Sequence, residues 1–416
     1  MRLAFVIQRY GRDLSGGAEF ECRALAERLS ARDEVEVLTT CATDYVTWEN
    51  HLPPGTGDWN GVRVTRYPVD QVRDVYTFSA WTQRILGWRA TQEPGASEPE
   101  VALAASSEDC ERWLVEQGPH SPALVRAVEK RGREFDAFVF FSYRYHTTVH
   151  GMKAVANRAV LVPTAEDDGV WRLPVFPSVF RSPQATVYNA PEERGLVTRA
   201  CSGFEPPGDI LGVGTESPTG ADPEGFRRRH GIDGPFLLYL GRVDRNKGCP
   251  ELFDFFRRYR IETGSRLQLV LVGRAVLPVP EGEGIVSLGF QSEAEKWNAL
   301  AACLALAIPS RLESLSIVTL EAFRAERPVL ASSRCEVLRG QCQRSNGGLY
   351  YWTYEEFHAA LSRLEFDAEL CREMGRNGLA FCETHYTWDV LEPRYRRLIE
   401  AAANGRHPAA PVEAAS

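Results

Sequence analysis

Two charged loops in the second half of the chain carry side chains suited to an anionic ligand that also bears hydroxyl groups. The first loop, G-R-V-D-R-N-K-G, follows the apolar run 236–240 and contains Gly241, Arg242 and Lys247. A loop that leads from a strand into a helix exposes backbone N–H groups at the positive end of the helix. Arg242 and Lys247 add two cations, so this loop predicts a phosphate site.

The second loop, E-S-L-S-I-V-T-L-E, places Glu313 and Glu321 on either side of a predicted helix start. Ser314 and Ser316 are candidate N-caps, and the amides of Leu315 and Ser316 would face a ligand beyond the helix tip. A carboxylate accepts two hydroxyl hydrogen bonds at once, which suits a sugar. Either loop alone is more often structural. Together in one α/β domain they predict a nucleotide-sugar site.

Three features resemble the retaining glycosyltransferases of family 4, a group with the two-domain GT-B fold. They are Gly241-Arg242 with Lys247-Gly248, the E-x(7)-E of Glu313 and Glu321, and Gly16-Gly17-Ala18-Glu19 near the start of the chain. The similarity of pattern extends over residues 1–399. The E-x(7)-E alone is a weak signal, and the combination is fairly specific.

The resemblance implies a role for several residues. Glu313 would contact the transferred sugar, Glu321 would hold the ribose hydroxyls, and Phe290 would lie near the nucleobase. Gly16 and Gly17 would approach the donor diphosphate. Attack would come from the front face, with the leaving phosphate oxygen taking the acceptor proton, and domain closure would exclude water.

The donor is expected to be a nucleotide-diphosphate sugar, with a UDP-sugar favoured over a GDP- or dTDP-sugar. Arg242, Lys247 and backbone amides can stabilise the leaving group without a metal, so no metal and no cofactor are assigned. The expected acceptor classes are a polysaccharide, a glycolipid precursor or a metabolite.

An acidic cluster departs from the family's pattern. Ala165-Glu166-Asp167-Asp168 follows the predicted strand 160–164, and adjacent carboxylates repel unless they are solvated or liganded. An acidic capping loop and a ligand site account for the cluster equally well. Similar proteins usually present a His here, whereas this chain has Glu166. The hypothesis is that Glu166 binds substrate; alternatively, it marks an altered donor or impaired transfer.

A second polar cluster follows the predicted strand 136–142. Tyr143, Tyr145 and His146 stand where contacts to an acceptor could arise, together with Asp167 from the acidic cluster. Packing in the core or placement on the surface is the more common fate of any one of these side chains.

The length of 416 residues indicates two domains, and alternating strand and helix patterns predict α/β domains with parallel sheets. Residues 1–205 form a predicted Rossmann-like domain on the acceptor side, with 48–61 as a loop excursion. Residues 206–385 form the predicted nucleotide-sugar domain. By the resemblance, 386–405 return to the first domain, and 406–416 are predicted to be disordered.

Composition excludes several classes of function. A net charge of −8 argues against nucleic acid as the main partner. The 10 cysteines show no CxxC pair or metal-ligand spacing, which favours reduced thiols and a cytoplasmic location. No run approaches the ~20 apolar residues of a membrane helix, so membrane contact is at most peripheral. The oligomeric state is not fixed.

Three readings of function therefore compete. The first is a glycosyltransferase. The second is another nucleotide-sugar enzyme on the same fold, such as a hydrolase or epimerase. The third is a non-catalytic nucleotide-sugar-binding protein, which the presence of Glu166 suggests. A nicotinamide dehydrogenase is disfavoured because the G-x-G-x-x-G fingerprint is absent.

Overall fold

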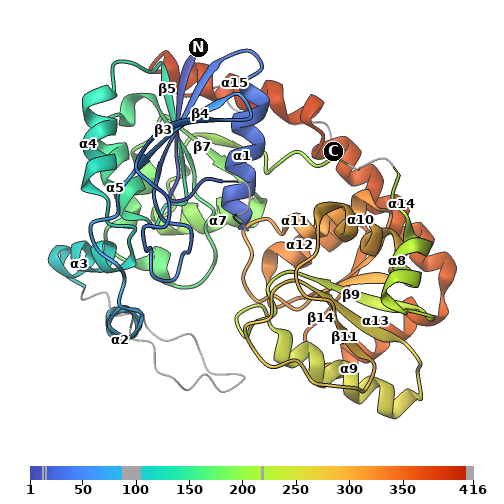
Figure 1. The fold of residues 1–416 in the computed structure, drawn as a ribbon. Helices are drawn as coiled ribbons and strands as arrows, with labels where there is room; N and C mark the ends of the chain where they lie inside the picture. The colour runs from blue at the N-terminus through green and yellow to red at the C-terminus, as the bar shows by residue number, and fades with distance from the viewer. Residues whose placement is uncertain (12–13, 15, 87–104, 217–219, 409–416) are drawn as a thin grey trace. The chain divides into compact units, whose positions relative to one another are not determined.

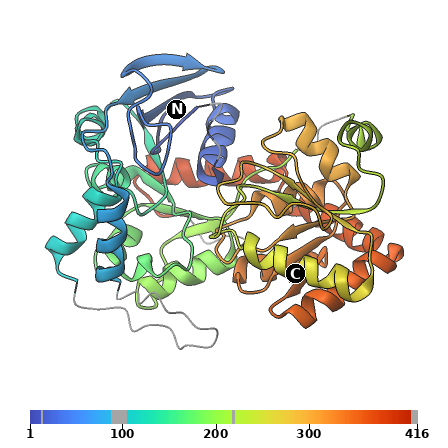
Figure 2. The same ribbon diagram turned by 60° about the horizontal axis from the view of Figure 1, so that its bottom comes forward.

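The computed structural model describes residues 1–11, 14, 16–86, 105–216 and 220–408. The chain divides into two compact units (Figures 1 and 2). Unit 1 comprises Met1–Val213 together with Glu392–Ser416, and unit 2 comprises Gly214–Leu391. The predicted disordered tail lies, from residue 409 onward, outside the described residues.

Unit 1 is built on an eight-stranded sheet with the order β3-β4-β2-β1-β5-β6-β7-β8. Neighbouring strands are parallel except for β3, which pairs antiparallel with β4. The strands are β1 (Arg2–Val6), β2 (Glu34–Thr40), β3 (Gly55–Trp59), β4 (Val62–Tyr67), β5 (Ala137–Phe141), β6 (Ala159–Val162), β7 (Ala185–Tyr188) and β8 (Gly208–Ile210). The strands β5, β6 and β7 are buried along their whole length, as continuous apolar runs in a parallel sheet should be.

Helices cover both faces of this sheet, with α1 on one side and α4 and α5 on the other in Figure 1. Ser121 precedes α4 and Pro122 opens it, as is typical of a helix start. The helices of unit 1 are α1 (Gly17–Leu29), α2 (Val75–Ile85), α3 (Ser107–Gln117), α4 (Pro122–Arg131), α5 (His146–Lys153), α6 (Phe176–Arg181) and α7 (Pro191–Ala200), with 3-10 turns at Ala156–Arg158 and Val170–Arg172.

Unit 2 contains an all-parallel sheet of six strands with the order β11-β10-β9-β12-β13-β14. The strands are β9 (Phe236–Leu240), β10 (Gln268–Val272), β11 (Ile285–Ser287), β12 (Ala305–Ile308), β13 (Val329–Ser332) and β14 (Gly348–Tyr351). The helices are α8 (Pro223–His230), α9 (Cys249–Thr263), α10 (Glu293–Ala302), α11 (Ile317–Arg324), α12 (Glu336–Ser345), α13 (Tyr354–Phe366) and α14 (Ala368–His385); α15 (Trp388–Ala403) begins in this unit.

Each sheet reverses its strand order at one point. In unit 1 the chain runs outward from β1 through β2 in one direction and from β5 through β6 in the other. In unit 2 the reversal lies between β9 and β12. Open α/β sheets bind ligands at such points, beyond the carboxyl ends of the strands. The loops after β1 and β5, and those after β9 and β12, are therefore the places where the fold favours a site.

Two sequence expectations were wrong about the first sheet. The stretch 48–61 contains the edge strand β3, which forms a hairpin with β4 where a loop was expected. The first unit also extends to Val213 and does not end at residue 205. The reason is that β8, expected to open the second domain, pairs with β7 and completes the first sheet.

The end of the chain completes unit 1. The Arg394 and Arg397 side chains of α15 pair with Asp209 at 2.7 and 2.9 Å, and the side chain of Asp209 is only 3% exposed. The Tyr395 hydroxyl, also on α15, donates to the carbonyl of Gly212. Since a buried carboxylate needs a partner, these contacts hold the last helix against β8.

All 10 cysteines are buried, and none forms a disulfide. Among the described residues, no helix combines the length and the apolar character that crossing a membrane requires.

Candidate functional site

The loop between β9 and α9 holds its two predicted cations through one buried aspartate. Asp244 accepts the backbone N–H of Lys247 at 2.8 Å and also pairs with the guanidinium of Arg242. The Tyr239 hydroxyl donates to the carbonyl of Arg242 at 2.7 Å. The loop is thus fixed before any ligand binds. The sequence analysis assigned no role to Asp244. An Asp in a short polar loop is nevertheless a typical turn residue, because its side chain accepts a backbone N–H a few residues further along the chain.

Gly248 ends this loop in the left-handed conformation, with φ 76°. A Cβ atom there would lie 2.2 Å from the carbonyl oxygen of Pro309, in the loop that follows β12. Glycine adopts this backbone without strain, and only glycine permits this close approach, so Gly248 brings the two loops together.

The loop after β12 leads into α11 through Ser316, which also has a left-handed backbone (φ 61°). Ser316 is the N-cap, so the alternative cap Ser314 is not used, and the Ser316 side chain does not cap the helix. It accepts the Thr319 hydroxyl at 2.9 Å instead. Gln341 donates to the carbonyl of Leu315 at 2.5 Å. The N–H groups of the first turn of α11 are consequently not covered by the Ser316 side chain.

Lys247 and Glu313 join the two loops. The Lys247 Nζ atom lies 2.7 Å from Oε1 of Glu313, and the two side chains are 33% and 15% exposed. The contact forms because β9 and β12 are neighbours, so their carboxyl ends meet at one edge of the sheet. The predicted phosphate loop and the predicted sugar loop therefore lie side by side, at the point where the strand order reverses.

Glu321 lies further inside α11 and is buried. Its Oε1 atom is 2.6 Å from Lys296 Nζ on α10, and Lys296 also contacts Glu293 at 2.6 Å. Burial raises the pKa of Glu321, against the lowering effect of Lys296. Lys296 was missed by sequence reasoning, since a partner 25 residues away on another helix leaves no local signal. Phe290, in the loop after β11, is 77% exposed.

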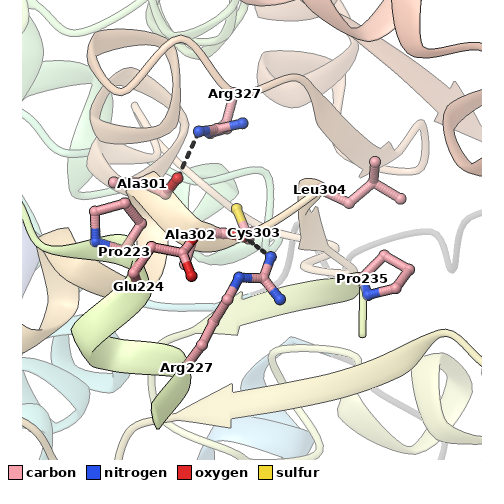
Figure 3. Close-up of a pocket in the computed structure, with 9 residues that line it drawn as sticks. All are labelled: Pro223, Glu224, Arg227, Pro235, Ala301, Ala302, Cys303, Leu304 and Arg327. Carbon is pink, nitrogen blue, oxygen red and sulfur yellow. Dashed lines mark hydrogen bonds between the residues drawn. The ribbon is translucent and has the colours of Figure 1, made fainter. Parts of the chain in front are cut away.

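A cavity of about 350 Å³ lies elsewhere on unit 2 (Figure 3). Arg227 and Arg327 donate there to the carbonyls of Ala302 and Ala301, at the end of α10. Other lining residues immediately precede β9 and β12, so the cavity is at the amino ends of these strands. It contains none of the predicted site residues. Because it faces the edge opposite to the charged loops, the cavity is separate from the candidate site.

In unit 1, Gly16 and Gly17 stand where the loop after β1 enters α1. Gly16 is the N-cap and Gly17 the first helical residue. The adjacent Glu19 is buried and accepts Gln8 Nε2 at 3.1 Å and Arg9 Nε at 2.9 Å. A Cβ at Gly16 would lie 2.0 Å from a Glu19 oxygen. The glutamate of the G-G-A-E pattern therefore anchors the loop, and the glycine leaves it room.

The acidic cluster after β6 is largely compensated. Asp168 pairs with Arg144 at 2.7 Å, and Asp167 accepts the indole N–H of Trp171 at 2.7 Å. Arg199 lies 3.7 Å from Asp167. Glu166 itself is partly exposed at the carboxyl end of its strand. The repulsion expected from three adjacent carboxylates is thus relieved by cations and a donor from the neighbouring segments.

Glu193 positions the backbone next to Glu166. It stands in the first turn of α7 and accepts the N–H groups of Ala165 and Asn189, each at 2.5 Å. Burial raises the pKa of Glu193 to about 8, although these two N–H groups act in the opposite direction. The sequence identified Glu193 only as an acidic residue of a helix start. The Glu193 side chain points inward because of the strands that lie next to each other in the sheet, and a local sequence pattern does not reveal which strands are neighbours.

Two of the three aromatic candidates for acceptor contact are core residues. Tyr143 is fully buried and packs against Phe176 and Phe180, so it is not available to an acceptor. His146 is 6% exposed, and burial lowers its pKa to about 3. Tyr145 is partly exposed and packs edge-on against Trp48. The strand ends here as predicted, but most of the side chains that follow it point inward.

Comparison with known proteins gives matches concentrated in unit 2. Residues 223–381 match the family Glycosyl transferases group 1. A glycogen synthase of Thermus thermophilus is 30% identical over 189 residues, which are 43% of this chain and 41% of the relative. A trehalose synthase of Rubrobacter xylanophilus is 30% identical over 187 residues, 40% of this chain and 42% of the relative. The matches thus span about two fifths of these curated relatives.

Solved structures resemble the whole chain. Sucrose-phosphate synthase from Thermosynechococcus elongatus covers 96% of this chain and 99% of its own, with a TM-score of 0.70 and 16% identity. HepE from Anabaena, in complex with UDP and glucose, covers 96% of this chain and 100% of its own, with a TM-score of 0.66 and 15% identity. The chain therefore has the GT-B fold of two Rossmann-like domains, and its residues 223–381 match the glycosyl transferases group 1 family.

Proposed function

We propose that the protein is a retaining glycosyltransferase that moves a sugar from a nucleotide-diphosphate sugar to an acceptor. The observation that carries the proposal is the 2.7 Å contact between Lys247 and Glu313. It joins a loop suited to phosphate with a loop suited to sugar hydroxyls, at the edge of the sheet where ligands of this fold class bind. A nucleotide-sugar is a ligand that uses both loops at once.

The two cations share one task in this proposal. Arg242 and Lys247 bind the diphosphate and stabilise the negative charge that develops on the leaving group. Asp244 holds Arg242 and the backbone of Lys247 in place, so little reorganisation is needed at the moment of transfer. Glu313 contacts the transferred sugar, and the N–H groups at the start of α11 add a positive end to the site.

Glu321 is proposed to accept the ribose hydroxyls. Its carboxylate is held by Lys296 at 2.6 Å, which favours the charged, accepting form inside a buried environment. The donor is proposed to be a UDP-sugar, a choice supported by the UDP and glucose in the HepE complex, whose fold this chain shares. Retention follows from front-face attack, in which the leaving phosphate oxygen takes the acceptor proton.

Binding of the donor is tested by thermal unfolding of the wild type with UDP, GDP, dTDP and ADP, repeated on Glu321→Ala. A ligand at about 100 times its Kd stabilises the unit that binds it by ~2.7 kcal/mol. We expect a rise in Tm with UDP that Glu321→Ala abolishes. The absence of a shift with all four nucleotides would refute the donor site.

Transfer is tested by product analysis with a UDP-sugar, with and without a panel of acceptors. A new glycoside with the anomeric configuration of the donor supports the proposal. Release of free sugar or an epimer at the same rate without acceptor identifies a hydrolase or epimerase instead. Binding without any turnover identifies the non-catalytic alternative, which the presence of Glu166 in the loop after β6 suggests.

Glu166 is proposed to bind substrate in unit 1. Its backbone neighbour Ala165 is held by Glu193, and its acidic neighbours are compensated by Arg144 and Arg199. A carboxylate on a fixed backbone can accept a sugar hydroxyl or stabilise oxocarbenium character. Unchanged kcat and KM in Glu166→Ala would rule this role out.

A further inference from the structure

Three side chains with metal-binding groups converge in unit 1. Glu111 comes from α3, and His146 and His150 come from α5. One ligand atom from each lies within 4.8 Å of the others. His146 and His150 are four residues apart on one helix, so their rings share a face, and α3 supplies the carboxylate from the side.

The distances are close to those of a loaded site. The His150 Nε2 atom already lies 3.0 Å from Glu111 Oε1. Metal–nitrogen distances of about 2.0–2.1 Å place neighbouring ligands of a tetrahedral ion roughly 3.4 Å apart. The three ligand atoms, all within 4.8 Å of one another, are thus near the spacing that one ion requires.

The cluster also contains buried nitrogen atoms that lack partners. The Nδ1 atoms of His146 and His120 have no hydrogen-bond partner among the residues that the structure describes. His146 is 94% buried, and its ring packs against His120 and His150 with centroids 4.6 and 4.5 Å apart. Buried polar atoms without partners are rare, because each costs free energy. Core packing alone explains the burial of these rings but leaves their nitrogen atoms unsatisfied.

The charges and access are compatible with a cation. Glu111 is the negative group of the cluster, and its half-exposed side chain opens the site to solvent. Burial lowers the pKa of both histidines, and the positive charge of Lys153, one turn beyond His150 on α5, acts in the same direction. The cluster thus offers two imidazoles, one carboxylate and an open side where water can complete the coordination.

We propose that Glu111, His146 and His150 bind a divalent transition-metal ion, with Zn²⁺ as the ion that the donor set fits best. Two imidazole nitrogens and one carboxylate oxygen suit Zn²⁺ far better than Mg²⁺ or Ca²⁺, which prefer oxygen ligands. A bound ion links α3 to α5. His146 changes, in this proposal, from a predicted acceptor contact to a metal ligand.

The test uses untagged full-length protein, treated with a chelator and titrated with Zn²⁺ or Co²⁺ alone. We expect one ion per chain, a rise in Tm, and visible Co²⁺ d–d absorption without a thiolate charge-transfer band, since the ligands are nitrogen and oxygen. Glu111→Ala and His150→Ala should each weaken Zn²⁺ binding by at least about 100-fold. Glu108→Ala, which removes an exposed carboxylate from the same helix, should leave binding unchanged.

The half-exposed position of Glu111 makes its removal compatible with folding, so this variant keeps the test decisive even where His150→Ala fails to fold. Wild-type protein without a Zn²⁺-dependent shift in Tm overturns the proposal. Binding that Glu111→Ala leaves intact, or a Co²⁺ spectrum with thiolate character, also overturns it, because either places the ion elsewhere.

Discussion

Replacing Lys247 by alanine should weaken UDP binding by more than the loss of one contact. The lost charge-assisted hydrogen bond is worth about 1.5–3 kcal/mol. The variant also leaves Glu313, whose side chain is only 15% exposed, without its cation. A carboxylate about 6 Å from a phosphate charge, at an effective dielectric of about 40, costs ~1.4 kcal/mol. The sum, roughly 3–4 kcal/mol, corresponds to about 100–1,000-fold weaker binding.

This reasoning predicts a rescue by a second change. In Lys247→Ala/Glu313→Gln the uncompensated charge is absent, so UDP should bind about tenfold more tightly than to Lys247→Ala alone. Transfer should stay lost, since Glu313 is the proposed sugar contact. Isothermal titration with UDP measures all variants. Arg245→Ala is the matched control, because this exposed cation stands in the same loop.

A double variant that binds UDP no better than Lys247→Ala would show that the ion pair has no bearing on the phosphate site. Equal weakening in Arg245→Ala would show that the loop responds to any loss of positive charge. The first result refutes the argument from the uncompensated charge of Glu313, and the second refutes the assignment of Lys247 as the specific phosphate ligand.

Three further outcomes are expected. Glu321→Ala leaves Lys296 buried with one carboxylate fewer, so the free energy of unfolding in urea should fall by about 2–3 kcal/mol. Burial raises the pKa of Glu21 to about 7. The stability that its neutral form provides is therefore fully present below pH 4.5 and is lost as pH rises through 7. Between pH 4.5 and 8, the free energy of unfolding of Glu21→Gln, measured by denaturation at each pH, should rise by about 3 kcal/mol relative to that of the wild type. Gly248→Ala should abolish UDP binding and cost more stability than Gly264→Ala, since both glycines have a left-handed backbone but only the first meets a carbonyl at 2.2 Å.

Each of these outcomes has a clear contrary result. An unchanged urea midpoint in Glu321→Ala would mean that the Lys296 ammonium does not need the Glu321 carboxylate as a partner. Parallel pH profiles for wild type and Glu21→Gln would mean that Glu21 has the same pKa in the folded and the unfolded protein. Equal effects of the two glycine substitutions would mean that the loop after β12 moves away from a Cβ atom at residue 248 at little cost in free energy.

The sequence predicted the central strands better than the edges. The apolar runs that became β1 and β9 stand out because strands of a parallel sheet are buried on both faces. The edge strand β3 reads G-T-G-D-W and is largely exposed, so it has neither the apolar pattern nor the propensity of a strand. It is a strand because β4 lies beside it.

The residues of the candidate site could be proposed one by one from the sequence, but their arrangement could not. Arg242, Lys247 and Glu313 stood out by their charge after apolar runs, and the turn residue Asp244 carried a local signal that was not used. The pairing of Lys247 with Glu313 depends on β9 lying next to β12, and strand order is decided by packing of the whole unit. The partner Lys296 and the burial of Tyr143 depend on tertiary contacts in the same way.

The place of α15 in unit 1 has a consequence for the order of events at the ribosome. Strands β1–β8 emerge early, but Asp209 can meet Arg394 and Arg397 only after the whole of Gly214–Leu391 has been synthesised. Until then the Asp209 carboxylate, which ends 3% exposed, lacks both arginine partners and favours hydration over burial. The unit translated first is therefore the one that reaches its final structure last, and a nascent chain that stops before Glu392 has a complete second unit and an incomplete first one.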